Sequence, residues 1–125
     1  MKMLHTMIRV YDLEKSLDFY RDALGLEVKR RLDVPEKEFS LVFLGIPGDD
    51  DGPQIELTYN HDRTKPYDRS DGYGHIAFRV PSIEDLGKRL KEHGVGWSWG
   101  PGKSPGGGGM AFIDDPDGYE IEILE

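Results

Sequence analysis

The sequence predicts an α+β fold built from two similar halves, each with the element order β-α-β-β-β. Three observations indicate this. An apolar segment led by histidine begins each half, at His5 and about seventy residues later at His75. A helix signal follows each segment, and each half ends in two strand patterns joined by a turn rich in Gly, Pro and Asp. We therefore expect a first module over residues 1–66 and a second over 67–125, within a single domain.

The first strand of each half is predicted at residues 5–10 and 75–80. Both segments are mainly apolar, carry an arginine four residues after the histidine and end in valine. Asp12 and Ser82 follow two residues later, and both residue types are good helix N-caps. Apolar residues then recur at steps of three and four, which predicts one buried helix stripe in each half, namely Leu13, Leu17, Tyr20 and Leu24, then Ile83, Leu86 and Leu90.

Glycines mark the ends of the two helices. Gly25 and Gly94 stand where a helix C-terminus favours a left-handed residue. A second strand is expected after each glycine, and a hairpin closes each half. The predicted strands are 26–30, 39–44 and 54–59 in the first half, and 95–99, 110–113 and 119–124 in the second.

Composition excludes several classes of protein. The chain of 125 residues has no cysteine, so disulfides, thiolate metal sites and cysteine nucleophiles are ruled out. A formal net charge of -8 argues against a general nucleic-acid binder, because phosphate contacts need a basic surface. Apolar runs are too short for a membrane span or a signal peptide, so we expect a cytoplasmic protein without a membrane partner.

Four residues in equivalent places predict a metal site. His5 and His75 begin the first strand of each half, and Glu56 and Glu122 lie in the last strand of each half. Strand alternation places both glutamates on the polar face of their strands, opposite isoleucine and leucine. Two imidazoles and two carboxylates suit a borderline divalent metal with positions left for water or substrate.

Two further polar residues share faces with these predicted ligands. Arg9 is four residues after His5, and Asn60 is four residues after Glu56. Four strand residues span roughly 13 Å, so the pattern suits an elongated polar molecule with its reactive end at the metal. Arg9 would also supply local positive charge in an acidic protein.

Six segments, in order and over essentially the whole chain, together have a known counterpart: His5-Thr-Met-Ile-Arg-Val, Ser16-Leu-Asp-Phe-Tyr, Leu24-Gly-Leu, Ile55-Glu-Leu-Thr-Tyr-Asn60, Tyr73-Gly-His-Ile-Ala and Asp115-Pro-Asp-Gly-Tyr-Glu-Ile-Glu122. With this set the chain resembles the bacterial glyoxalase I (lactoylglutathione lyase) family of the vicinal oxygen chelate superfamily. The resemblance implies paired βαβββ modules that form an open, cup-shaped mixed sheet. It also implies a homodimer in which His5 and Glu56 of one chain meet His75 and Glu122 of the other.

The implied reaction is isomerisation of the hemithioacetal of methylglyoxal and glutathione to S-D-lactoylglutathione by proton transfer through an ene-diolate. By resemblance Glu122 is the main base, and Glu56 acts on the other face of the substrate. Arg9 and Asn60 would hold the glutamyl end of glutathione, His75 would border the substrate, and Lys103 would lie near the glycyl carboxylate. Ni²⁺ is the metal that the resemblance favours, with Co²⁺ or Zn²⁺ as alternatives.

The chain departs from the family pattern at Asp71 and in the loop around Ser104 to Gly109, which is richer in glycine than the usual pattern. Some members carry an arginine four residues before the second histidine, where this chain has Asp71; Arg69 is near but out of step. The rival functions are another metalloenzyme of the superfamily (an epimerase, a dioxygenase or a thiol transferase) and a metal-free resistance protein that binds small molecules. Metal content separates the last of these from the enzymes.

Overall fold

The computed structural model describes residues 1–125, and the chain divides into two compact units, residues 1–68 and 69–125. Each unit contains one four-stranded mixed sheet and a helical segment between its first two strands. The predicted α+β fold of paired βαβββ modules is therefore confirmed. No helix is both long and apolar enough to cross a membrane.

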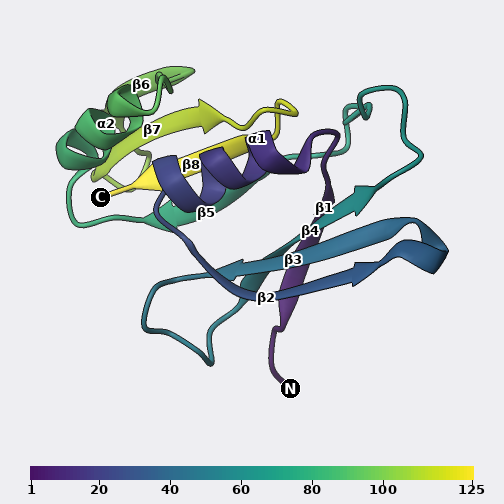
Figure 1. Ribbon diagram of the computed structural model, residues 1–125. Helices are drawn as coiled ribbons and strands as arrows, with labels where there is room; N and C mark the ends of the chain where they lie inside the picture. Colours follow the sequence, from purple (N-terminus) through teal and green to yellow (C-terminus); the bar gives the residue numbers. More distant parts are fainter. The chain divides into compact units, whose positions relative to one another are not determined.

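The first unit has the strand order β1-β4-β3-β2. Strand β1 is parallel to β4, whereas β3 is antiparallel to both of its neighbours. The helical segment runs over the buried face of this sheet (Figure 1). The elements are β1 (His5–Arg9), α1 (Leu13–Leu17), the π-helical turn η1 (Asp18–Ala23), β2 (Glu27–Val34), the 3-10 turn η2 (Pro35–Lys37), β3 (Phe39–Gly45) and β4 (Gln54–Asn60).

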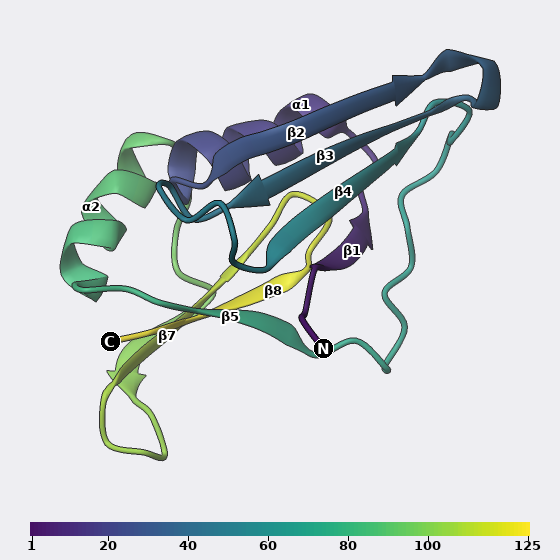
Figure 2. The ribbon, with the colours of Figure 1, turned by 90° about the horizontal axis from the view of Figure 1, so that it is seen from below.

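The second unit repeats this topology in the order β5-β8-β7-β6, again with the first strand parallel to the last. Figure 2 labels β5, β8 and β7 of this unit. The match in strand order and direction is what an internal duplication produces. The elements are β5 (His75–Arg79), α2 (Ile83–Glu92), β6 (Trp99–Lys103), β7 (Gly109–Asp114) and β8 (Glu120–Leu124).

The helix boundaries follow the predicted caps. The side chain of Asp12 accepts a hydrogen bond from the backbone N–H of Lys15, and that of Ser82 accepts one from Asp85, at 3.2 and 3.1 Å. Gly25 and Gly94 have φ angles of 91° and 73°, which glycine adopts without a steric penalty. Both predicted N-caps and both glycine ends are confirmed.

Each sheet has one buried and one open face. Apolar residues of alternate strand positions pack with the helical segments, and polar residues between them point the other way. The open face therefore carries the predicted metal ligands, and the buried face stabilises it. The core comprises Ile8, Leu13, Leu17, Tyr20, Val42, Leu44, Ile55 and Leu57 in the first unit, and Ile83, Leu86, Leu90, Ala111, Ile113, Ile121 and Ile123 in the second.

One predicted strand was wrong. Residues 95–98 are not a strand, and β6 instead spans Trp99–Lys103. Trp97 turns toward α2, where a Cβ on Gly87 would lie 3.2 Å from its ring. The strand itself reads Trp-Gly-Pro-Gly-Lys and has a register irregularity between Trp99 and Gly102, so its sequence lacks the apolar alternation that identifies a strand.

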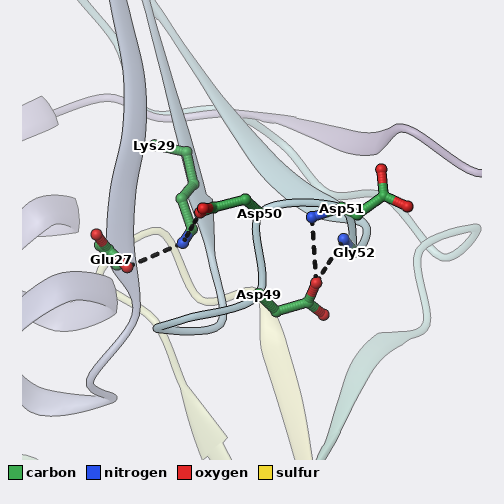
Figure 3. Close-up of polar contacts among 6 residues, drawn as sticks. All are labelled: Glu27, Lys29, Asp49, Asp50, Asp51 and Gly52. Atoms are coloured by element: carbon green, nitrogen blue, oxygen red, sulfur yellow. Dashed lines mark hydrogen bonds and ion pairs between the residues drawn. The ribbon is translucent and has the colours of Figure 1, made fainter.

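The loop between β3 and β4 is organised by carboxylates (Figure 3). Asp49 accepts hydrogen bonds from the backbone N–H groups of Asp51 and Gly52 at 3.2 and 2.8 Å. Lys29 reaches Glu27 and Asp50 at 2.9 Å each, and these hydrogen bonds raise the pKa of its ammonium group. The loop is thereby fixed beside the open face of the first sheet.

Candidate metal centre and substrate face

The first unit brings His5 and Glu56 together. Nε2 of His5 lies 2.9 Å from Oε2 of Glu56, and the imidazole edge packs on the ring of Phe43 with centroids 5.5 Å apart. The side chain of Glu56 is only 12% exposed, whereas that of His5 is 41% exposed. The carboxylate is thus held in a partly desolvated position while the imidazole remains accessible to a ligand.

The second unit repeats the same arrangement. Nε2 of His75 lies 3.3 Å from Oε2 of Glu122, and the imidazole packs on the edge of Phe112 at 5.5 Å. Phe43 and Phe112 pair directly with the glutamates across their strands. The duplication therefore reproduces a three-residue group of histidine, glutamate and phenylalanine in both units.

The two glutamates differ in the hydrogen bonding of the carboxylate oxygen that does not face the histidine. Oε1 of Glu56 accepts a 3.1 Å hydrogen bond from the hydroxyl of Thr58, two residues along β4. Leu124 occupies the equivalent place after Glu122 and has no hydroxyl to donate. Glu122 is therefore less restrained than Glu56.

The donors in each pair fit a divalent metal. An imidazole nitrogen and a carboxylate oxygen face each other, as two ligands of one ion would. Within neither unit does a group of three or more such side chains gather. Each module by itself thus offers two protein ligands, and a four-ligand centre needs two such pairs.

Arg9 and Asn60 lie at the same end of the first sheet. Arg9 is in register with Thr58 across the parallel pair of β1 and β4, two residues before Asn60. The amide of Asn60 donates a 2.9 Å hydrogen bond to the hydroxyl of Tyr67, whose ring lies 4.3 Å from the guanidinium of Arg63. Sequence reasoning missed Tyr67, because its contact with Asn60 comes from the irregular connector after β4.

A cavity of about 460 Å³ lies beside His5 in the first unit and is bordered by the carboxylate-rich loop. Arg30 lies over the ring of Phe43 at 5.3 Å and contributes a cation to this cavity. Sequence reasoning missed Arg30, because its role depends on the pairing of β2 with β3.

Lys103 lies at the end of β6, opposite Gly109. A Cβ on Gly109 would meet Ile83 of α2 at 3.1 Å, so this register position belongs to the helix-covered face. Glu122 pairs with Phe112, which is three residues after Gly109 on the same strand. Because side chains alternate along a strand, Glu122 lies on the other face of the sheet. A substrate contact by Lys103 stays a prediction.

Arg69, near the departure at Asp71, supports the turn before β8. Its guanidinium donates to the backbone carbonyl of Gly118, which has a φ angle of 82°. Asp71 accepts a hydrogen bond from Ser70 at 3.3 Å. Arg69 thus contacts the Asp-Pro-Asp-Gly turn, which accounts for an arginine near this place.

The sequence matches one protein family over residues 2–123, described as the Glyoxalase/Bleomycin resistance protein/Dioxygenase superfamily. Among characterised relatives, it is 46% identical to the lactoylglutathione lyase of Neisseria meningitidis over 127 residues, which covers 100% of this chain and 91% of the relative.

Solved structures agree with the sequence comparison. The trypanothione-dependent glyoxalase I of Leishmania major superposes with a TM-score of 0.85 at 43% identity and covers 100% of this chain and 86% of its own. Glyoxalase I of Zea mays superposes with a TM-score of 0.90 at 34% identity, and the match spans 98% of this chain but 44% of the maize chain.

Proposed function

The chain belongs to the Glyoxalase/Bleomycin resistance protein/Dioxygenase superfamily, and from this membership we propose that it is a lactoylglutathione lyase. Its reaction is isomerisation of the methylglyoxal-glutathione hemithioacetal to S-D-lactoylglutathione through an ene-diolate. The observation that carries the proposal is the His-Glu pair repeated in both modules, at 2.9 and 3.3 Å. The cytoplasm, where glutathione is abundant, is the compartment that we propose for it.

The reaction needs a base that can take a proton from one carbon and return it to the next. A carboxylate with a free oxygen can do both. Glu122 has this freedom, because only one of its oxygens has a partner in the protein, at His75. Both oxygens of Glu56 are engaged, by His5 and Thr58. We therefore assign the main proton transfer to Glu122 and a supporting role on the opposite substrate face to Glu56.

The same four side chains would hold the metal: His5, Glu56, His75 and Glu122. When bound, a divalent ion would supply electrostatic stabilisation of the negative charge that develops on the substrate oxygens. We propose Ni²⁺ as the native ion, with Co²⁺ and Zn²⁺ as alternatives, because the resemblance to bacterial glyoxalase I favours nickel.

We also propose a homodimer with two active sites at the subunit interface, each formed by the first module of one chain and the second module of its partner. Each module offers only two ligands, fewer than the three that catalytic metal sites commonly take from the protein. A two-fold dimer would contain two such sites, and in each of them the His5–Glu56 pair of one chain would meet the His75–Glu122 pair of its partner.

Mixing two inactive variants tests this arrangement. One variant carries His5→Ala with Glu56→Gln, and the other carries His75→Ala with Glu122→Gln. Refolding or exchanging the two together would give heterodimers with one intact site, and about a quarter of wild-type activity for random pairing of subunits. A site formed within one chain would give no recovery.

Arg9 and Asn60 would bind the glutamyl end of glutathione. A guanidinium provides charge-assisted hydrogen bonds to a carboxylate, and Tyr67 fixes the Asn60 amide. The identity of the thiol needs its own test, because the Leishmania relative is described as trypanothione-dependent.

The experiment that tests the function is turnover of methylglyoxal plus glutathione by metal-stripped protein re-supplied with nickel, cobalt or zinc separately. Metal-dependent formation of S-lactoylglutathione supports the proposal and ranks the ions. Metal binding without turnover, for glutathione and for trypanothione alike, would contradict the lyase activity. Turnover that persists in the stripped protein would contradict the metal site.

A further inference from the structure

We infer that Arg79 is a substrate-binding residue of the second module, and that it holds the glycyl carboxylate of the thiol. The inference rests on the proposed lactoylglutathione lyase activity and adds a specificity-determining residue to it. Arg79 stands four residues after His75, as Arg9 stands four residues after His5. The duplication thus provides one arginine at the same distance from each metal-binding histidine.

Arg79 shares a cavity with the proposed base. A hollow of about 410 Å³ in the second unit is lined by Arg79, Glu122, Leu124 and Glu125 and by four residues of the glycine-rich loop, Ser104, Pro105, Gly106 and Gly108. Its volume lies within the range of small-molecule sites. Arg79 is at the end of β5 in register with Leu124, and Glu122, two residues earlier on β8, lies on the same face of the sheet.

The guanidinium of Arg79 has no hydrogen bond or ion pair within the protein, and its side chain is exposed. The carboxylates around it have other partners. Oε2 of Glu122 faces His75, and Oε2 of Glu125 accepts a 2.7 Å hydrogen bond from the backbone N–H of Ile83. The cavity therefore contains a cation that no side chain of the protein neutralises.

The chemistry of a guanidinium selects a carboxylate as its ligand. It presents planar donors that match two carboxylate oxygens. Glutathione carries a carboxylate at each end, and we assign the glutamyl end to Arg9. The remaining carboxylate, on glycine, is then the group for Arg79. Lys103, the other cation near the glycine-rich loop, lies at a register position of the helix-covered face.

A comparison of two ligands tests this assignment. S-methylglutathione and its glycyl ethyl ester differ at the glycyl carboxylate, where the ester removes the negative charge and adds an ethyl group. Their binding to metal-loaded protein is measured by calorimetry, for the wild type and for Arg79→Gln. We expect the ester to bind the wild type roughly ten- to a hundredfold more weakly, and Arg79→Gln to bind both ligands with nearly equal, weak affinity.

Three variants serve as controls. Arg79→Lys keeps the charge but not the planar donors, and should recover part of the ester difference. Lys91→Gln removes one positive charge from an exposed position on α2, outside the cavity, and should keep the full difference. Lys103→Gln tests the competing expectation that Lys103 contacts the glycyl carboxylate, and it should keep the difference if Arg79 holds that group. The metal affinity of Arg79→Gln should equal that of the wild type, which separates ligand binding from damage to the metal centre.

Each outcome decides the inference. An ester difference in Arg79→Gln equal to that of the wild type overturns it, and loss of the difference in Lys103→Gln alone would transfer the role to Lys103. A wild type that binds neither S-methylglutathione nor its ester overturns the inference together with glutathione as the thiol. The wild type could bind the ester more weakly than S-methylglutathione, and Arg79→Gln could lose that difference, while the wild type does not turn over methylglyoxal with glutathione. That result would support the inference and contradict the lyase activity.

Discussion

The hydroxyl of Thr58 donates a 3.1 Å hydrogen bond to Oε1 of Glu56, and nothing equivalent restrains Glu122. The two modules otherwise present the same histidine, glutamate and phenylalanine in the same geometry. Two positions after the glutamate, the first module has Thr58 and the second has Leu124. This one change of residue type therefore distinguishes two carboxylates that the duplication made equivalent. This difference is the structural reason for assigning different roles to the two glutamates.

Glu122→Gln should reduce turnover by about a hundred- to ten-thousandfold, the usual contribution of a general base, while the fold is retained. Glutamine keeps the size of the side chain and can still coordinate through its carbonyl oxygen, but it cannot accept the proton. Steady-state kinetics with saturating metal measure the effect.

The matched control is Glu56→Gln, whose loss of turnover should be smaller because its carboxylate is held by Thr58. Metal content, measured on both variants, shows whether lost turnover reflects lost metal. Near wild-type turnover in Glu122→Gln would remove Glu122 from the role of base, and a larger loss in Glu56→Gln would exchange the two roles.

Thr58→Val should weaken metal binding by roughly ten- to a hundredfold, since groups that orient a ligand commonly contribute that much to affinity. Valine has nearly the same shape but no hydroxyl, so Glu56 would lose the bond that fixes its orientation. Competition with a chromophoric chelator measures the affinity.

Thr58→Ser keeps the hydroxyl and should retain the wild-type affinity. Leu124→Thr is the reciprocal change in the second module and should strengthen binding through Glu122. Unchanged affinity in Thr58→Val would show that the hydrogen bond at Glu56 does not organise the metal centre.

Much of this site could be predicted because polar and apolar residues alternate along a strand, and this alternation shows which residues share a face. The period of two placed Glu56 and Glu122 opposite buried residues, and the repeat paired each with a histidine. The family and the lyase activity that the resemblance indicated are borne out by relatives that cover the whole chain. The metal ion, the dimer and the role of each site residue remain proposals.

The parts that sequence reasoning missed depend on tertiary contacts or on weak local signals. Tyr67 reaches Asn60 from an irregular connector, and Arg30 reaches Phe43 across a strand pair, so neither has a signal in its own segment. Strand β6 was misplaced because two glycines and a proline interrupt it. Pairing with β7, and not intrinsic propensity, makes it a strand.

Arg9→Ala should raise the KM for the hemithioacetal by roughly ten- to a hundredfold, because it removes a charge-assisted hydrogen bond to the substrate. The metal affinity should change little, since Arg9 lies four residues along β1 from His5. Kinetics at saturating metal, together with a metal titration, separate the two effects.

Tyr67→Phe offers a milder change at the same end of the sheet, because it removes only the hydroxyl that holds the Asn60 amide. Its KM should rise less than that of Arg9→Ala. An unchanged KM in Arg9→Ala would count against the anchor role, and an equal loss of metal affinity would indicate a general disturbance of the first module.

Asp33→Asn should lower stability at neutral pH and have a diminishing effect in acid. Asp33 accepts hydrogen bonds from Arg31 at 3.0 Å and from the buried hydroxyl of Ser40 at 2.6 Å, and these lower its pKa. Since that hydroxyl donates to Asp33, it accepts from Nε2 of His61 at 2.8 Å, so the carboxylate anchors the residue that follows β4.

The sign of the pH dependence follows from the lowered pKa. A carboxylate with a folded pKa below its unfolded value contributes stability above the unfolded pKa, near 3.8, and loses it as the pH falls through the folded value. Urea unfolding of the wild type and Asp33→Asn should therefore show the full difference above about pH 4, and the difference should shrink as the pH falls below 3.8 and through the lowered folded pKa. A difference that persists unchanged in acid would show that the Asp33 charge does not stabilise this end of β4.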